Sequence, residues 1–103
     1  NLAEASKPAI IERNGTKIAF VSRTSVGTPG MEATVDTPGV AFYPIQTLYE
    51  PPARVHSNPG LPPIVHTVPD RGVHRTALEA DIRTAREQAD VVIVSWHWGL
   101  SPY

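Results

Sequence analysis

The clearest pattern of apolar positions lies near the C-terminal end of the chain, at residues 91–95. The run Val91-Val92-Ile93-Val94-Ser95 is apolar or small at every position and is rich in β-branched side chains. A continuous run of this kind is typical of a strand that is buried on both faces of a sheet. We therefore expect a core strand here, with Asp90 leading into it and His97 at its carboxyl end.

A helical pattern precedes this strand. Apolar residues recur at the spacing of a single helix face, at Leu78, Ile82, Ala85 and Ala89. Thr76, followed three residues later by Glu79, matches a capping box, in which each side chain bonds a free backbone N–H of the other residue. The sequence predicts a helix from Thr76 to about Ala89 and, with the strand after it, half of a β-α-β unit. No other segment is an obvious neighbour for that strand on both of its sides.

An earlier part of the chain predicts a β-hairpin. The segments Lys7–Arg13 and Thr16–Ser22 read as two strands, and Asn14-Gly15 between them is a strong two-residue turn signal, because both turn positions need positive φ. In the second strand Ile18 and Phe20 share one face and Ala19 and Val21 the other, so we expect both of its faces to be covered.

Residues 24–75 form a proline-rich insertion between these two patterned regions. The chain has 11 prolines, about twice the ordinary usage of ~5%, and most of them lie here. Two weak strands are predicted, at Gly39–Tyr43 and Ile64–Val68, with Pro44 limiting the first to a sheet edge. We expect an ordered excursion that packs over a larger body or over the mouth of a site, because loops of this length are rarely structureless and this one carries large apolar side chains.

Composition restricts the class of protein. The 103 residues allow one small domain, and a net charge of −1 gives no sign of nucleic-acid binding. The chain has no cysteine, which excludes a disulfide framework and a thiolate metal site. Because the sequence begins Asn1-Leu2 without an initiating methionine, we expect a processed or partial chain.

His97 is the strongest candidate for chemistry, because ligands in open α/β sheets bind beyond the carboxyl ends of strands. It is read either as a metal ligand or general base, or as a core histidine whose ring nitrogens bond the backbone. Trp96 and Trp98 should point away from it and form walls. The remaining histidines and the acidic residues of the insertion are interpreted as exposed loop residues or turn caps: His56, His66, His74, Asp36, Glu50 and Asp70. No nucleophile elbow, P-loop or dinucleotide fingerprint occurs in the sequence.

Taken together, several segments resemble the bacterial CapA family of poly-γ-glutamate capsule biosynthesis. They are residues 5–20, 30–34, 37–41 and, most specifically, 78–83 and 89–99, in which His97-Trp98-Gly99 matches a triplet that ends a strand in the family. The resemblance implies an α/β fold, as part of a metallophosphoesterase-like sandwich made of two mixed sheets between helices. It also implies a metal-dependent phosphoesterase-like hydrolase site, with His97 as a metal ligand and with Trp98 and Gly99 in the wall of the site.

The chain departs from the family pattern in one respect. The family's Asp, Gly-Asp, Gly-Asn-Asn-His and Gly-His-His-Pro-His motifs are missing from it. The resemblance therefore implies that residues 1–103 are the middle part of one domain and that the remainder of that domain is their partner. Divalent Mn, Zn or Fe ions would then bind in the complete domain. This chain alone would bind no metal tightly and would be inactive.

An alternative stays open. The same fold could serve a non-catalytic surface or membrane-associated assembly factor for an anionic polymer, in contact with polymer-synthesis machinery. In either case the resemblance implies a location in the bacterial cell envelope or outside the cell.

Overall fold

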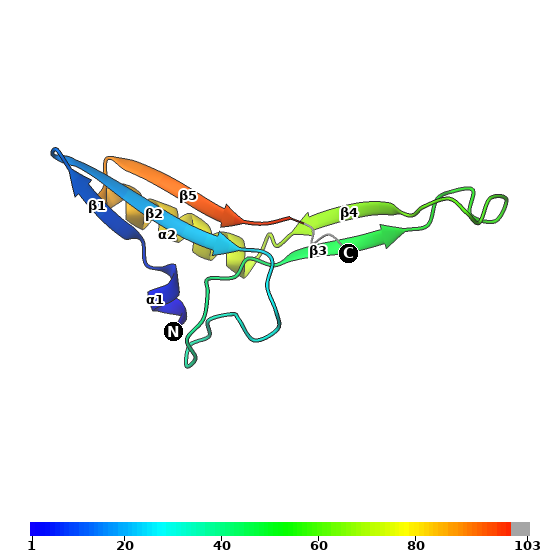
Figure 1. The fold of residues 1–103 in the computed structure, drawn as a ribbon, viewed down its shortest axis with the longest axis horizontal. Coiled ribbons are helices and arrows are strands. Elements are labelled where there is room, and N and C mark those ends of the chain that lie inside the picture. Colours follow the sequence, from blue (N-terminus) through cyan, green and yellow to red (C-terminus); the bar gives the residue numbers. More distant parts are fainter. Residues whose placement is uncertain (100–103) are drawn as a thin grey trace.

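A computed structural model of the chain describes residues 1–99 as a small α/β body from which a long two-stranded arm projects (Figure 1). The elements follow in the order α1 (Leu2–Ser6), β1 (Ala9–Arg13), β2 (Thr16–Thr24), β3 (Ile45–Glu50), β4 (Ile64–Pro69), α2 (Val73–Gln88) and β5 (Val91–His97). The arm gives the molecule its elongated shape, with principal extents of 64 × 31 × 27 Å. The predicted α/β class is confirmed.

The body is built on a three-stranded sheet in the order β1-β2-β5. The predicted hairpin is confirmed, because β1 and β2 pair antiparallel around Asn14 and Gly15, whose φ angles are +52° and +77°. β5 then pairs parallel to β2, with Ile18 opposite Val91 and Thr24 opposite His97. Asp90 fixes the start of this ladder, since its carboxylate accepts from Lys17 N at 2.8 Å and its own N–H donates to Lys17 O at 2.9 Å.

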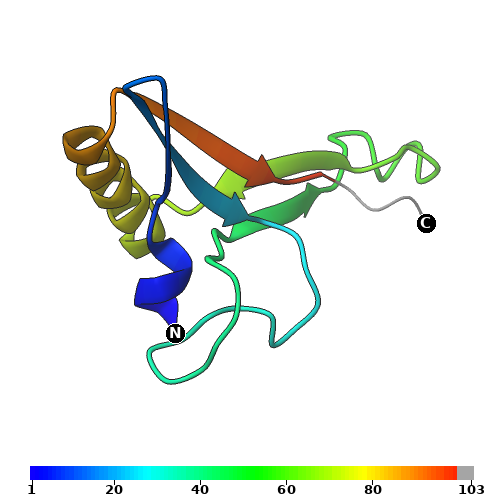
Figure 2. The same ribbon diagram turned by 60° about the vertical axis from the view of Figure 1, so that its left-hand side comes forward.

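Helix α2 connects the parallel strands and covers one face of the sheet (Figure 2). The predicted apolar stripe is the face that packs: Leu78 and Ala85 are buried, and Ile82 and Ala89 flank them. Beneath the helix lie Ala19 and Val21 of β2, both fully buried. The small residues Ala19 and Ala85 let the helix approach the strand closely, which completes a β-α-β unit.

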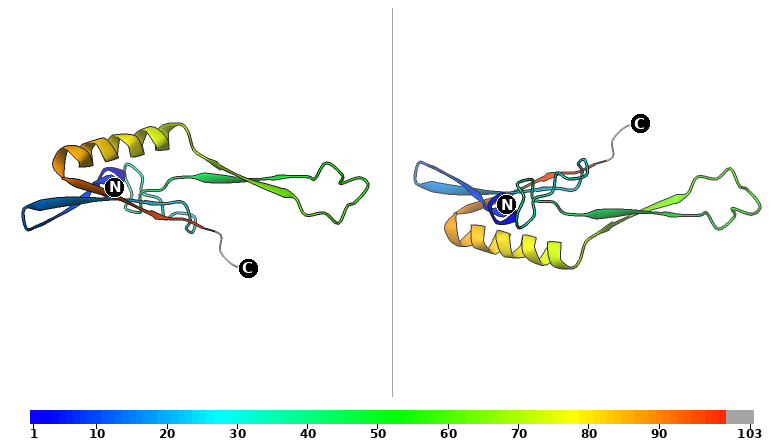
Figure 3. Two further views of the ribbon diagram at one scale, coloured as in Figure 1. Left: turned by 90° about the horizontal axis from the view of Figure 1, so that it is seen from above. Right: turned by 90° about the horizontal axis from the view of Figure 1, so that it is seen from below.

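β5 differs from the prediction of a strand buried on both faces. Val92 and Trp96 lie under α2, but Val91, Ile93 and Val94 remain 43%, 42% and 41% exposed. The reason is tertiary: within residues 1–99, β5 is an edge strand with β2 on one side only, and α2 lies along one side of the sheet (Figure 3). The expectation that both faces of β2 are covered is wrong for the same reason, because Ile18 and Phe20 on the opposite face are only half-buried.

The start of α2 also differs from the prediction. The helix begins at Val73, one turn before the predicted N-cap Thr76, and its N-cap is Gly72, which has no capping side chain. The Thr76 hydroxyl instead donates to Gly72 O at 3.1 Å from within the first turn. Asp70 accepts from His74 N at 3.0 Å, so a carboxylate satisfies one of the free N–H groups of the first turn. Neither helix within residues 1–99 is long and apolar enough to cross a membrane.

The proline-rich insertion divides into a loop and the arm. The predicted strand at Gly39–Tyr43 is reduced to single bridges, in which Val40 pairs with Glu32 and Phe42 pairs with Thr24. The predicted strand at Ile64–Val68 is confirmed as β4. Its partner β3, Ile45–Glu50, lies between prolines and has no prediction from the sequence. The arm projects from the body instead of packing over it, which contradicts the expectation for this part of the insertion (Figure 1).

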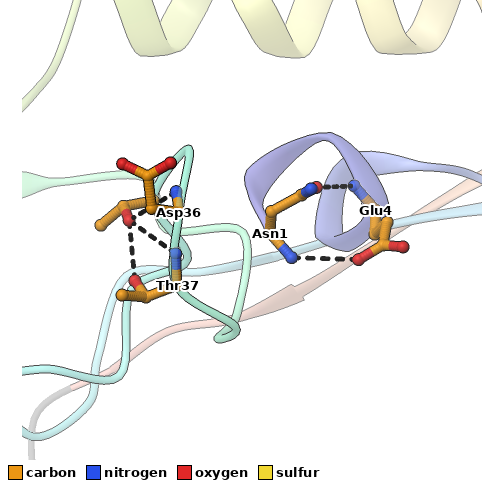
Figure 4. Close-up of polar contacts among 5 residues, drawn as sticks. Asn1, Glu4, Asp36 and Thr37 are labelled. Atoms are coloured by element: carbon orange, nitrogen blue, oxygen red, sulfur yellow. Dashed lines mark hydrogen bonds and ion pairs between the residues drawn. The ribbon is translucent and has the colours of Figure 1, made fainter.

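The short helix α1 closes the N-terminal end of the body and likewise has no prediction from the sequence. Asn1 and Glu4 form a reciprocal capping box, and the Asn1 side chain accepts from Glu4 N at 3.2 Å (Figure 4). The neighbouring turn at residues 34–37 is held by the Thr34 hydroxyl, which accepts from the backbone N–H groups of Asp36 and Thr37. Leu2 N donates to Thr34 O at 2.7 Å and joins the helix to this turn.

Candidate functional site

The carboxyl ends of the parallel strands β2 and β5 bring Thr24 and His97 side by side. The pairing of the two strands sets these residues opposite each other, at the last position of each strand. The Thr24 hydroxyl lies 3.4 Å from Nδ1 of His97, and it also donates to Val26 O at 2.6 Å. Thr24 is buried, whereas the His97 ring is exposed. His97 therefore lies at the strand end, where the sequence predicts it, with a buried hydroxyl beside one ring nitrogen.

His97 is not the satisfied core histidine of the alternative reading. Its ring is open to solvent, and among residues 1–99 its Nε2 atom has no hydrogen-bond partner. A neutral imidazole in this state can accept a proton or bind a metal ion through Nε2. The ring is therefore accessible to a ligand at Nε2.

An open cleft of about 740 Å³ adjoins this strand end and lies between the sheet and the base of the arm. Aromatic side chains from two segments contribute to its wall: Phe42, Tyr43, Trp96 and Trp98. Ser25, Thr47 and Thr67 add hydroxyls, and Gly99 completes the side next to Trp98. Of the described residues that line the cleft, none is charged. This lining can bind a ligand by stacking and hydrogen bonding.

The two tryptophans have different environments. Trp96 is a structural wall: its ring packs at 4.8 Å and 60° against Tyr43, and its Nε1 donates to Ser25 Oγ at 2.8 Å. Tyr43 in turn donates from its hydroxyl to Asp70 O. Trp98 is 72% exposed at the mouth of the cleft, so its indole is free to contact a ligand.

The sequence predicts the other histidines to be exposed loop residues, but two of them lie in regular elements, His66 in a strand and His74, half-buried, in a helix. His66 is on β4 and its Nε2 lies 2.7 Å from a Glu50 carboxylate oxygen across the arm. His74 is in the first turn of α2, with its ring 6.4 Å from the Tyr43 ring. His56 lies in the loop that joins the two arm strands. Asp36 and Asp70 serve as a turn residue and a helix cap, as expected.

These positions test whether the described residues can hold a metal ion. Within residues 1–99, no three histidine or acidic side chains lie close enough to share a metal ion. A two-metal centre requires several ligands around ions that are ~3.5–4 Å apart. The donor set of this part of the chain does not fit such a centre, because His97 is a single imidazole.

One ion pair at the surface shows perturbed ionisation. Arg75 Nε donates to Glu79 Oε1 at 2.8 Å, one helical turn away. This hydrogen bond, with the attraction between the charges, lowers the pKa of Glu79 and raises the pKa of Arg75. Both residues border a second depression, about 470 Å³, on the other side of Tyr43 and Trp96. The pair stabilises α2 and is separate from the strand end that carries His97.

Thr24, Ser25 and Phe42 are residues of the site that the sequence reasoning did not predict. Thr24 is separated from His97 by 73 positions, and Phe42 reaches the same edge through a single bridge to Thr24. Only the parallel pairing of β2 with β5 brings these segments together, and no local motif indicates it.

The model of the bacterial capsule synthesis protein family PGA_cap matches residues 1–101. The chain belongs to this family. The match confirms the resemblance to the CapA family and identifies a capsule synthesis protein. No curated protein matches the chain.

Proposed function

We propose that this capsule synthesis protein acts in the formation of poly-γ-glutamate, and that its complete domain carries a metal-dependent, phosphoesterase-like hydrolase site to which this chain contributes His97. The observation that supports the proposal best is the exposed imidazole at the carboxyl end of β5, in a chain that matches the family over residues 1–101. The remaining ligands would come from outside residues 1–99, because a single imidazole does not make a metal centre.

The uncovered face of the sheet supports the view that the remainder of the domain packs here. Opposite α2, five apolar side chains form a half-exposed patch: Ile11, Ile18, Phe20, Val91 and Ile93. Monomeric proteins rarely expose contiguous apolar patches of this kind without a partner surface. The patch lies on the same face of the sheet as Thr24 and His97, which follow Phe20 and Ile93 by four residues along their strands, so a segment that extends over this face would reach the candidate site.

The isolated chain should be inactive and should bind divalent metal weakly. We expect metal analysis of the full-length protein, after extensive dialysis, to find bound Mn, Zn or Fe, and to find at least ten-fold less in His97→Ala. His66→Ala, which removes an exposed histidine from the arm, is the matched control and should keep its metal. Stoichiometric metal on the isolated chain, or equal metal in both variants, would contradict the proposal.

The alternative is a non-catalytic assembly factor, and the nature of the cleft supports it. Its wall is aromatic and hydroxyl-rich and includes Trp98, so it suits binding better than acid–base chemistry. Assays of the full-length protein with phosphodiester and γ-glutamyl substrates separate the two functions. Turnover that is lost in His97→Ala favours the hydrolase, whereas polymer binding that survives His97→Ala without turnover favours the assembly factor.

A further inference from the structure

The arm formed by β3 and β4 has no partner among the described residues. Its two strands form a separate sheet and pair only with each other. Both of its faces expose large apolar side chains, at fractions of 51%, 67%, 50% and 51% for Leu48, Tyr49, Ile64 and Val65. An isolated two-stranded hairpin is marginally stable in water, and at least three strands or a packed face are needed for independent stability. The arm is therefore expected to bind another element.

The hydrogen bonds between β3 and β4 show which residues of the arm direct their N–H and C=O groups outward. Asp70 N donates to Pro44 O at 3.1 Å, and the strand register continues this ladder with Gln46 opposite Val68. In an antiparallel pair, alternate residues direct their N–H and C=O groups away from the partner strand. On β3 these outward positions are Ile45, Thr47 and Tyr49.

The two edges of the arm differ in their ability to accept a further strand. The outward positions of β4 include Pro69, which has no N–H to donate. The outward positions of β3 carry neither proline nor charge, which are the usual devices that protect an edge from pairing. The edge of β3 is thus the one that is open to strand addition.

We propose that this edge pairs antiparallel with β3 of a second copy of the chain, about a two-fold axis at Thr47, to form a four-stranded sheet. In this register Thr47 lies opposite Thr47 of the other copy, and Ile45 lies opposite Tyr49. All three outward positions then form hydrogen-bonded pairs, which gives about six new backbone hydrogen bonds.

Registers centred one residue away would form fewer hydrogen bonds between the two strands. Centring the pair on Leu48 would set Ile45 opposite Pro51, which has no N–H. Centring it on Gln46 would set Tyr49 opposite Tyr43, which is only 5% exposed within the body. Only the register centred on Thr47 places all three outward positions of β3 in hydrogen-bonded pairs.

The side chains also match in this register. One face of the four-stranded sheet would carry a row of threonines, Thr67 and Thr47 from each copy, and the rows beside it would be apolar. Cross-strand threonine pairs and pairs of aromatic with β-branched residues stabilise sheets. Glu50 would lie opposite Pro44, so no like charges meet. Because the strands are antiparallel, the two bodies would lie at opposite ends of the sheet, and each chain would turn away after Glu50 at the body of the other copy.

A proline pair tests the proposal in the full-length protein. Thr47→Pro removes an outward N–H of β3, whereas the control Thr67→Pro removes an outward N–H of β4, and neither N–H is used within the arm. Because the paired edge is short, the dimer belongs to the weak class of interfaces, below ~1,200 Å². We expect sedimentation velocity to show concentration-dependent dimers for the wild type and Thr67→Pro, and at least ten-fold weaker association for Thr47→Pro.

Cysteine cross-linking provides a second measurement that does not depend on proline substitutions. In the proposed register the Cα atoms of the two Thr47 residues would be ~5.5 Å apart, within the range of a disulfide. The Thr67 residues would be three strands apart, or ~14 Å. Mild oxidation should therefore cross-link Thr47→Cys but neither Thr67→Cys nor the unsubstituted protein. A monomeric wild type, equal effects of the two prolines, or no cross-link at Thr47→Cys would overturn the proposal.

Discussion

Arg23 of β2 and Asp81 of α2 form an ion pair that ties the sheet to the helix covering it. The Arg23 side chain is only 4% exposed and that of Asp81 is 26% exposed. Arg23 also donates through its other terminal nitrogen to Ser22 O at 2.8 Å. A guanidinium that is buried this deeply is tolerated because the Asp81 carboxylate balances its charge and its N–H groups have hydrogen-bond acceptors.

Removing the carboxylate of this pair should destabilise the fold strongly. Asp81→Ala leaves the Arg23 charge buried without its partner, and we expect the free energy of unfolding to fall by about 3 kcal/mol. The value lies at the low end of the range for buried pairs, because Asp81 keeps some contact with solvent. Urea denaturation followed by circular dichroism measures the change. Glu87→Ala, the same kind of change at an exposed position of α2, should alter the stability little; equal losses in the two variants would refute a structural role for the pair.

Ala85 should not accept a larger side chain. It is fully buried between α2 and the sheet, so Ala85→Leu must displace its neighbours and should cost about 1–3 kcal/mol of unfolding free energy. Ala80→Leu adds the same atoms on the exposed side of the helix and should be close to neutral. Thermal unfolding of both variants compares them directly. A stable Ala85→Leu variant would mean that α2 does not pack closely on β2.

The turn between β1 and β2 should be sensitive to Gly15. Its φ of +77° is a left-handed conformation, so Gly15→Ala should destabilise the hairpin by about 1 kcal/mol even though its Cβ would meet no other atom within 4 Å. Gly60, in the loop between the arm strands, has no such φ, and Gly60→Ala serves as the control. Chemical denaturation should separate the two variants, and a neutral Gly15→Ala would show that the turn is free to change its conformation.

The Arg75–Glu79 pair should make a pH-dependent contribution to stability. The hydrogen bond from Arg75 lowers the pKa of Glu79 from its ordinary value of 4.5. The contribution is therefore complete above that value and is lost as the pH falls through the lower pKa of the folded state. Side-chain carboxyl NMR should detect Glu79 titrating below its ordinary range, with a return to that range in Arg75→Gln. Arg86→Gln, elsewhere on the helix, should leave the Glu79 titration unchanged; an ordinary pKa in the unsubstituted protein would argue against the pair in solution.

Local patterns determined much of the secondary structure. The hairpin at Asn14-Gly15 follows from the positive φ that its turn demands, and the stripe from Leu78 to Ala89 follows from the period of the helix. These features depend on neighbours in the sequence, so the sequence alone predicts them. The same is true of β5 as a strand with His97 at its end.

Two other features lack clear local signals in the sequence, because of flanking prolines in one case and a missing capping side chain in the other. β3 lies between Pro44 and Pro51, and its few residues carry no strong alternation, so local signals favoured a loop. The first turn of α2 starts at Gly72 without a capping side chain, while Thr76 and Glu79 imitate a capping box further along. β3 is held by its pairing with β4, whereas the first turn of α2 is held by the Asp70 carboxylate, which accepts from His74 N.

The sequence by itself determined the hairpin, the amphipathic helix and the strand that ends at His97, because each is encoded by the spacing of nearby residues. Only the tertiary structure decided that β5 is an edge strand, that Arg23 meets Asp81, and that Thr24 lies beside His97. Each of these facts depends on the register of strands that are far apart in the chain. Such a register is selected by the packing of the whole sheet against α2, which no local pattern contains.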